Sequence, residues 1–302
     1  MLKPTKPVIV IFLAPAILFY LIIFLYPTFR TTVMSFFAVE NVSDSVSKWS
    51  FNGIANYIKL FNSPIFIRSL KNIFKIWFVG GAGVMFMALV LAIILTNNTK
   101  GSKFFRSVIF LPNIISAVAM GTMWLNYVYN PEYGLLSNVL GALGFEAASK
   151  IIWTGPGLRF WAMLVAYGFG SVGYYMLIFI SGIEQIPKDF YEAAIIEGAG
   201  TVRRFFLVTA PFLRGVTRTN FVIWSTGALG FFVWSQVFSP LTISNDTVAP
   251  MNYLYELVFG QTTTVYVRDS GASAAIGVLM VLAILVVFFV TSFIIRNDDA
   301  KV

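Results

Sequence analysis

Long apolar runs divide the sequence into six stretches that are each long enough to cross a membrane. A spanning helix needs about 20 mainly apolar residues. The stretches that meet this length cover residues 8–29, 73–95, 107–129, 160–183, 213–238 and 273–295. The pattern therefore predicts an all-α polytopic membrane protein with six transmembrane helices, forming a single transmembrane domain over residues 1–302.

Three segments between these stretches are apolar in part but lack spanning length. Residues 38–70 mix bulky apolar side chains with Lys and Arg, which predicts a short helix at the membrane interface. Residues 130–144 and 252–260 also show apolar periodicity. They either pack against the protein's own helices or contact a partner outside, and the sequence leaves both interpretations open.

The composition agrees with membrane insertion. Hydrophobic residues make up 58% of the chain and charged residues 11%, whereas soluble domains carry about 25% charged residues. The first apolar stretch begins behind Lys3 and Lys6, as a signal peptide would. It is too long for one and no small-x-small cleavage site follows, so we expect an uncleaved anchor.

The sequence contains neither Cys nor His. Disulfides and thiolate chemistry are therefore excluded, and the commonest general base and metal ligand are missing. A membrane enzyme would need a catalytic group of residues, and the sequence shows none. We expect a chain that is not an enzyme and holds no cofactor or metal of its own.

Basic residues in the connecting loops indicate the orientation, because loops on the cytoplasmic side carry an excess of Lys and Arg. With the N-terminus inside, the inner segments hold more than half of the 21 basic residues, and the outer loops 129–158 and 239–270 hold only Lys150 and Arg268. We predict that both termini are cytoplasmic (N-in, C-in). The net charge of +8 is interpreted as loop charge that sets this topology, with no nucleic-acid partner.

The predicted spans lack the residues that couple transport to ions. None of the 13 acidic residues falls in the middle of a span, although proton and ion relays place such residues there. Lys75, Arg214 and Arg218 lie near predicted span ends, where long side chains can reach the headgroups. A stand-alone secondary transporter is thereby disfavoured, but a uniporter or channel remains an alternative.

The chain also has no GxxxxGK[ST] phosphate-binding loop. If it moves solute actively, the energy must enter through a partner at the inner face. The inner loop between the fourth and fifth spans, residues 184–212, is the candidate contact and is called the 184–212 insert below.

The 184–212 insert reads as two short helices. Pro187 and Asp189 suit the first turn of a helix, and Gly198 can end that helix in the left-handed conformation. Thr201 is expected to cap a second helix that Pro211 ends or kinks. Phe190, Ala193 and Ala194 share one face of the first helix, and Glu192, Glu197, Arg203 and Arg204 offer charges at its rim.

The spacing in this insert resembles the EAA loop of permease subunits of bacterial binding-protein-dependent ABC importers. Glu192, Ala193 and Ala194 are followed after three residues by Gly198, and the segment ends on Pro211. The family pattern ends I-x-L-P, whereas this chain has Val208 and Ala210 before Pro211. Similarity to the sugar-importer branch extends along nearly the whole chain, through stretches such as FNGIANYIKLF and YGLLSNVLGALG.

The resemblance implies a type I ABC importer permease fold in a bacterial plasma membrane. It implies a heterodimer with a second permease, two cytoplasmic ATPase subunits that bind ATP and Mg²⁺, and an extracytoplasmic binding protein that delivers a carbohydrate. It also implies that the insert transmits ATP-driven motion to the spans. The residues to which it assigns this coupling are Glu192, Ala193, Ala194, Glu197, Gly198, Ala199, Gly200, Arg203 and Pro211.

Polar and aromatic residues of the fourth and fifth spans are candidates for a carbohydrate path, since aromatic faces and side-chain amides bind sugars. The alternative is that each aromatic residue simply packs or lies in an interfacial belt. The candidates are Tyr167, Tyr174, Asn220, Trp224, Ser225, Phe231, Trp234 and Gln236.

Overall fold

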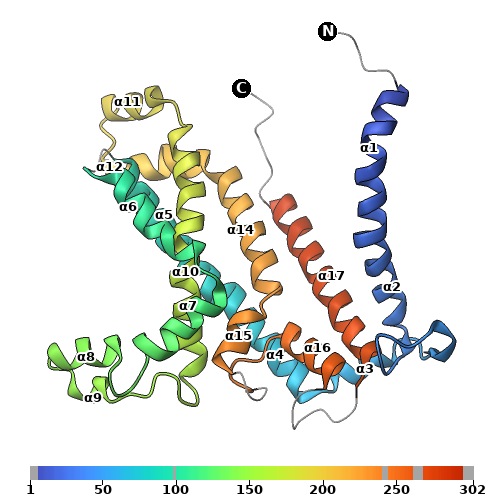
Figure 1. Ribbon diagram of the computed structural model, residues 1–302. Helices are drawn as coiled ribbons and strands as arrows, with labels where there is room; N and C mark the ends of the chain where they lie inside the picture. Colours follow the sequence, from blue (N-terminus) through green and yellow to red (C-terminus); the bar gives the residue numbers. More distant parts are fainter. Residues whose placement is uncertain (1–5, 98–99, 240–243, 261–267, 295–302) are drawn as a thin grey trace. The chain divides into compact units, whose positions relative to one another are not determined.

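A computed structural model describes residues 6–97, 100–239, 244–260 and 268–294, and it is mostly helical (Figure 1). The all-α prediction holds except for one antiparallel pairing of two-residue strands, β1 (Phe37–Ala38) and β2 (Ser50–Phe51). In chain order the helices are α1 (Lys6–Tyr20), η1 (Leu21–Leu25), α2 (Tyr26–Met34), η2 (Val46–Lys48), α3 (Ala55–Phe61), α4 (Pro64–Lys75), η3 (Ile76–Gly80), α5 (Gly81–Thr96), α6 (Ser102–Ile114), α7 (Ala117–Met123), η4 (Trp124–Val128), α8 (Leu135–Ala142), α9 (Glu146–Ser149), α10 (Arg159–Glu184), α11 (Lys188–Ile196), α12 (Thr201–Arg204), η5 (Phe205–Thr209), α13 (Ala210–Phe212), α14 (Arg214–Leu229), α15 (Val233–Phe238), α16 (Pro250–Phe259) and α17 (Ser270–Ile294).

Several of these helices are long and apolar enough to span a membrane. Within the described residues, four helices qualify by length and composition: Val10–Met34, Pro64–Thr96, Arg159–Glu184 and Ser270–Phe293. The pair Ser102–Ile114 and Ala117–Val128 makes a fifth if it is counted as one span, although the two parts are bent by 100°. Residues 213–238 form two shorter helices, α14 and α15. The fold is thus a membrane-helix fold of four or five candidate spans.

The two breaks have local causes. Pro112 lies inside α6 and removes a backbone donor, and after the extended Ile115 the side chain of Ser116 caps α7 by accepting from the N–H of Ala119 at 3.3 Å. α14 stops before Gly230, and Phe232 (φ −137°) separates it from α15.

The helix that contains the predicted span 73–95 begins at Pro64 and runs to Thr96. Lys75 therefore lies well inside this helix, and the prediction that it sits within about a turn of a helix end is wrong. Its ammonium group stands over the ring of Phe160 at 5.5 Å, which gives the charge a partner within the protein.

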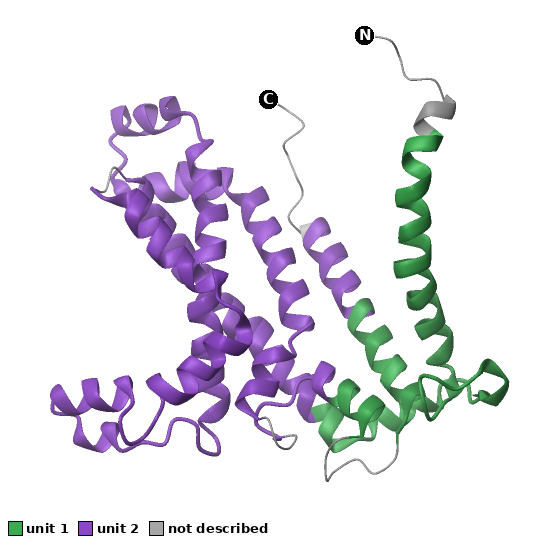
Figure 2. Cartoon of the chain, viewed as in Figure 1, with its two compact units in different colours: residues 1–67, 253–281 green, residues 68–252, 282–302 purple. Residues whose placement is uncertain are grey.

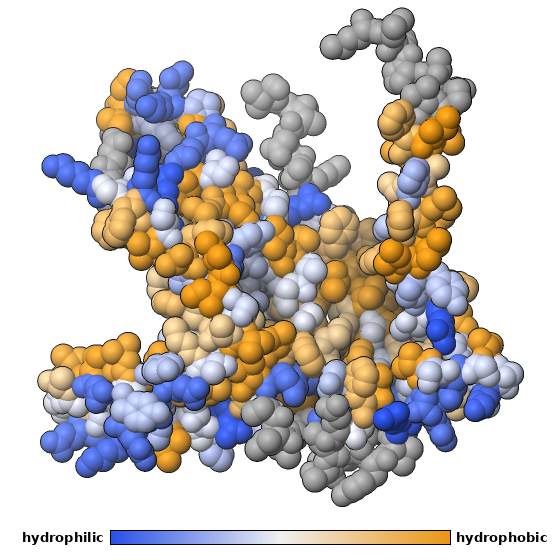
Figure 3. All heavy atoms as spheres, viewed as in Figure 1, coloured by the Kyte–Doolittle hydropathy of each residue, from blue (hydrophilic) through white to orange (hydrophobic). Residues whose placement is uncertain are grey.

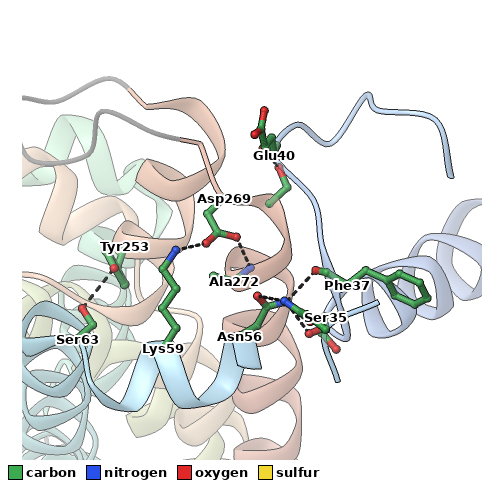
Figure 4. Close-up of polar contacts among 11 residues, drawn as sticks. Ser35, Phe37, Glu40, Asn56, Lys59, Ser63, Tyr253, Asp269 and Ala272 are labelled. Carbon is green, nitrogen blue, oxygen red and sulfur yellow. Dashed lines mark hydrogen bonds and ion pairs between the residues drawn. The ribbon is translucent and has the colours of Figure 1, made fainter. Parts of the chain in front are cut away.

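The chain divides into two compact units, residues 1–67 with 253–281 and residues 68–252 with 282–302 (Figure 2). In the first unit, the amide of Asn56 on α3 donates to the carbonyl oxygens of Ser35 and Phe37, each at 2.9 Å (Figure 4). Asp269 accepts from Lys59 at 2.5 Å and from the N–H of Ala272 at 2.8 Å. These contacts fasten α3 and the preceding chain to the start of α17.

The helix α3 confirms that the segment 38–70 contains a short helix. Asn56 and Leu60 are buried on one side of it, and Ile58 and Phe61 are exposed on the other. The helix α16 overlaps the apolar segment 252–260, and its Tyr253 and Leu257 are buried. For α16, packing on the protein's own chain is therefore the interpretation that holds.

The core of the second unit surrounds α10, which packs along α5 and α6 and contacts α14. Its buried apolar side chains form one continuous cluster that includes Met163 and Phe179 of α10, Ala88 of α5 and Trp224 of α14. Because α10 joins the segment 129–158 at its first residue and the 184–212 insert at its last, these two segments lie at opposite ends of a 26-residue helix. Figure 1 shows them at opposite ends of the unit.

Candidate functional site

The 184–212 insert folds as a compact helical hairpin at the end of α10. α11 begins at Lys188 after Pro187, as predicted, and ends at Ile196. Gly198 adopts a left-handed conformation (φ 75°), which a residue with a β-carbon would resist. The N–H groups of Gly198 and Ala199 donate to the carbonyls of Ile195 and Ala194, closing the helix end.

The second helix begins without the cap that the sequence suggested. Gly200 is the residue that precedes α12, and the hydroxyl of Thr201 accepts from Arg204 instead of capping a backbone N–H. The capping role predicted for Thr201 is wrong because the helix starts at Thr201 itself, one residue earlier than expected, so that Gly200 takes the cap position. α12 continues through the π-helical turn η5 into α13, so the returning arm is longer than a simple second helix.

Two side-chain contacts brace the hairpin. The hydroxyl groups of Tyr191 on α11 and Thr209 on η5 lie 3.0 Å apart. The rings of Phe190 and Phe212 pack with their centroids 4.9 Å apart. The outgoing and returning arms are therefore tied together near the membrane-helix end, away from the tip.

The tip of the hairpin exposes apolar side chains. Ile196 is 85% exposed, and Ile195 and Val202 beside it are also exposed. Among the residues that the sequence assigned to coupling, Ala199 is buried and Ala194 is half-buried; the exposed ones are Glu192, Ala193, Glu197, Gly198, Gly200, Arg203 and Pro211. The tip is thus an apolar surface with charges at its rim.

Trp224 lies in a slot between two helices of the second unit. Its side chain is fully buried, and its indole N–H donates to the carbonyl oxygen of Trp77 at 2.9 Å. The indole of Trp77 donates in return to the hydroxyl of Ser225 at 2.8 Å. A β-carbon on Gly81 would come within 2.5 Å of the Trp224 ring nitrogen, so only glycine leaves room there.

Aromatic rings from α10, α14 and the chain that follows cluster around Tyr167. Its ring centroid lies 5.3 Å from that of Trp224, 5.1 Å from Phe231 and 5.8 Å from Trp234. Trp224, Phe231 and Trp234 are buried, and Tyr167 is half-buried. The structure therefore brings these four candidate path residues together.

The other candidates lie around this cluster or away from it. Asn220 is fully buried, and its side-chain oxygen has no hydrogen-bond partner among the described residues. Ser225 is buried and engaged by Trp77. Tyr174 and Gln236 are exposed, and the Gln236 amide oxygen lies 3.4 Å from the Asn252 nitrogen.

A cavity of about 770 Å³ opens between α6, α10, α13 and α14, next to the insert. Tyr174 lines it, together with three polar residues that the sequence reasoning missed: Ser181, Gln185 and Thr219. The signal for two of them was present, because Ser181 and Gln185 are polar residues four apart at the end of an apolar span. The arrangement offers hydroxyl and amide groups beside apolar walls.

Residues 85–301 match the family model of the binding-protein-dependent transport system inner membrane component. The chain belongs to this family. It is 32% identical over 235 residues to YurN of Bacillus subtilis, a probable ABC transporter permease protein, with 77% of this chain and 78% of YurN covered. It is 31% identical over 286 residues to AraP of Bacillus subtilis, an arabinooligosaccharides transport system permease protein, with 93% of this chain and 86% of AraP covered.

The fold also matches a solved transporter. A chain in the crystal structure of the bacterial alginate ABC transporter, in complex with alginate pentasaccharide-bound periplasmic protein, superposes with a TM-score of 0.78 at 21% identity. The match covers 95% of this chain and 93% of that chain. The family resemblance inferred from the EAA spacing is thus confirmed, and the chain is a permease component of an ABC importer, not an enzyme. The alternative of a stand-alone transporter or channel is set aside.

Proposed function

We propose that this permease component carries a carbohydrate across a bacterial plasma membrane, as one half of a heterodimer with a second permease. An extracytoplasmic binding protein delivers the sugar, and two cytoplasmic ATPase subunits bind ATP and Mg²⁺. Support for the solute class comes from the oligosaccharides named for AraP and for the alginate transporter. Substrate uptake by the reconstituted assembly is the property to measure.

The proposed topology has six spans with both termini inside. α14 and α15 together form the fifth span, although Gly230 interrupts it. A broken helix can cross a membrane where neighbouring helices surround its exposed backbone, and Trp224 and Ala228 of α14 are fully buried. With the insert inside, Lys188, Arg203 and Arg204 fall on the side that the positive-inside rule favours.

The observation that carries the coupling proposal is the apolar tip of the 184–212 insert. Ile195 and Ile196 are exposed on a hairpin whose arms the Tyr191–Thr209 contact ties together. A braced element can transmit force, and exposed apolar side chains favour burial against a partner. The tip docks on an ATPase subunit. Because the insert links the end of α10 to the start of α14, closure of the ATPase dimer moves both helices.

A single substitution tests this docking. Ile196→Asp places a charge at the tip, and we expect a loss of at least about tenfold in binding-protein-stimulated ATP hydrolysis and uptake, since a buried unpaired charge opposes association. Val46→Asp is the matched control, because Val46 is also an exposed aliphatic residue (67% exposed) but lies outside the insert. The measurement uses the purified assembly in proteoliposomes, with the amount of assembled complex quantified.

Equal activity of Ile196→Asp and the wild type would remove the tip from the coupling interface. The solute class is tested separately, by uptake of labelled oligosaccharides from a panel in the presence of the binding protein. A transporter that takes up only peptides or amino acids would contradict the carbohydrate assignment while leaving the coupling result intact.

For the path itself we propose the aromatic cluster at Tyr167 and the cavity that Tyr174 lines. Aromatic faces suit the C–H surfaces of a sugar, and Ser181, Gln185 and Thr219 supply hydrogen-bonding groups for its hydroxyls. The side-chain oxygen of Asn220, which has no hydrogen-bond partner in the described part of the chain, is a further acceptor next to Thr219 in sequence.

A further inference from the structure

The segment between η4 and α10 forms a second helical hairpin, made of α8 and α9. It projects to the side of α6, α7 and α10, at the end of the unit opposite α11 (Figure 1). We call residues 133–150 the α8–α9 hairpin. Nothing in the transport mechanism described above uses it.

The α8–α9 hairpin leaves a large apolar face uncovered. Leu135 and Leu143 are 61% and 66% exposed, and Val139 and Phe145 are also exposed. Residues 135, 139 and 143 follow the spacing of one helix face. The opposite side of α8 is satisfied, because Leu136 packs against the core and Ser137 is buried. The exposed face is therefore not a by-product of a loosely packed helix.

The apolar face has a definite direction. Figure 3 shows apolar atoms along the edge of this hairpin that is turned toward the spans, and polar atoms along the edge turned away. No charged residue occurs from Tyr133 to Phe145, whereas Glu146 and Lys150 follow in α9 and the turn after it. The hairpin is thus divided between an apolar side and a charged side, as interfacial helices are.

The helices that flank the hairpin in sequence also expose apolar side chains. Tyr127 in η4 and Trp161 in the first turn of α10 are exposed on either side of the hairpin. Tyr and Trp gather where a bilayer meets water. Val165 and Phe169 continue the exposed apolar surface further along α10. Exposed residues of these two types near the hairpin are what a position at the headgroup level would require.

We propose that the α8–α9 hairpin lies flat at the extracytoplasmic surface of the plasma membrane. Its apolar face inserts among the lipids. The lipid surface is favoured as the occupant because α10, which follows the hairpin, exposes Trp161, Val165 and Phe169 at four-residue intervals on one helix face, as a helix turned toward lipid does. An uncharged face also offers nothing for charge-complementary docking of a protein. The hairpin then acts as an interfacial anchor that keeps the first turn of α10 at a constant depth in the bilayer.

Single-cysteine labelling tests this placement, because this chain contains no Cys and each variant can be labelled at one known position before it is assembled with its partners. Val139→Cys reports on the apolar face, and Lys150→Cys, also exposed, is the matched control on the polar side. Each variant is labelled with an environment-sensitive fluorophore in the complete assembly, in nanodiscs that contain lipids with a nitroxide near the headgroup. Uptake by each labelled variant verifies that the assembly is intact.

We expect the nitroxide lipid to quench the probe at residue 139 several-fold more than the probe at residue 150, and aqueous iodide to show the reverse order. Equal access of iodide to both positions would overturn the proposal. Shielding of residue 139 from both quenchers would assign the face to a protein partner and would overturn it as well. The result does not depend on the sugar or on the ATPase contact, so it can fail while the proposed function stands.

Discussion

The slot around Trp224 and the 184–212 insert both contain large apolar side chains, which are buried in the slot and exposed in the insert. In the slot, aromatic rings are buried, hydrogen-bonded and pressed against glycine, with Gly81 facing the indole of Trp224. In the insert, Ile196 and Val202 stand in solvent, and the hairpin is tied at only one end. The first arrangement packs α14 closely against α5, and the second leaves apolar side chains uncovered. Apolar character alone does not distinguish the two; the packing around each side chain does.

The largest effect is expected from a substitution that adds volume beside Trp224. Gly81→Ala adds a methyl group within 2.5 Å of the Trp224 ring nitrogen. Because the ring is fully buried and its indole N–H is held by the carbonyl of Trp77, we expect overpacking of about 1–3 kcal/mol and a large loss of monodisperse protein in detergent. Gly83→Ala in the same helix is the control, since a β-carbon there meets nothing within 4 Å. Equal yields of both variants on size exclusion would show that the slot tolerates displacement.

In the insert, we expect a glycine substitution to lower uptake without affecting folding of the protein. A β-carbon at Gly198 or Gly200 meets nothing within 4 Å, but only Gly198 has a positive φ (75°). Gly198→Ala therefore costs about 1–2 kcal/mol of local strain, which tilts the tip and should lower uptake several-fold with normal complex assembly. Gly200→Ala lacks this strain and should lower uptake less than Gly198→Ala. Identical uptake rates for the two variants would separate the left-handed turn from coupling.

A smaller effect is expected from removing the hydrogen bond between Trp77 and Ser225. Trp77→Phe removes the donor to Ser225 while keeping an aromatic ring, and the carbonyl of Trp77 still accepts from Trp224. We expect a loss of about 1 kcal/mol, the usual net value of one hydrogen bond, seen as a fall of a few degrees in the apparent melting temperature. Ser225→Ala should give a similar shift, and the double variant should add little to either. Fully additive shifts would mean that the two side chains act independently.

The smallest effect is expected at the brace of the insert. Tyr191→Phe deletes one hydroxyl of the pair with Thr209 but leaves the ring in place. Because the Phe190–Phe212 contact remains, we expect at most about a twofold fall in uptake and no change in melting temperature. Phe190→Ala, which removes the second tie, should reduce uptake further. A complete loss of uptake in Tyr191→Phe would place this hydroxyl in the coupling step itself.

The local form of the insert followed from local signals. Pro187 and Gly198 act within a few residues of themselves, so the bounds of α11 could be predicted closely. Thr201 misled because a capping residue works only when the chain enters the helix from it, and here Gly200 occupies that place. The bend after Ile114 was missed for a related reason, since Pro112 lies within an apolar run that reads as one span.

The candidate path depended much more on distant contacts. The sequence identified Trp224 as an aromatic residue in a span but not the carbonyl of Trp77 that it meets from another helix. It also passed over Ser181 and Thr219, which are ordinary polar residues until α10 and α14 form a cavity between them.

The family, the apolar helices and the local form of the 184–212 insert could be predicted from the order of residues, because span length and motif spacing are properties of neighbours along the chain. Only the tertiary structure shows which aromatic residues pack between helices and which line a cavity. It also shows which face of α8 is left uncovered. Burial is the reason. The environment of Trp224 or Leu135 is set by segments far away in sequence, and identical residue types end in a core or at a surface according to what packs beside them.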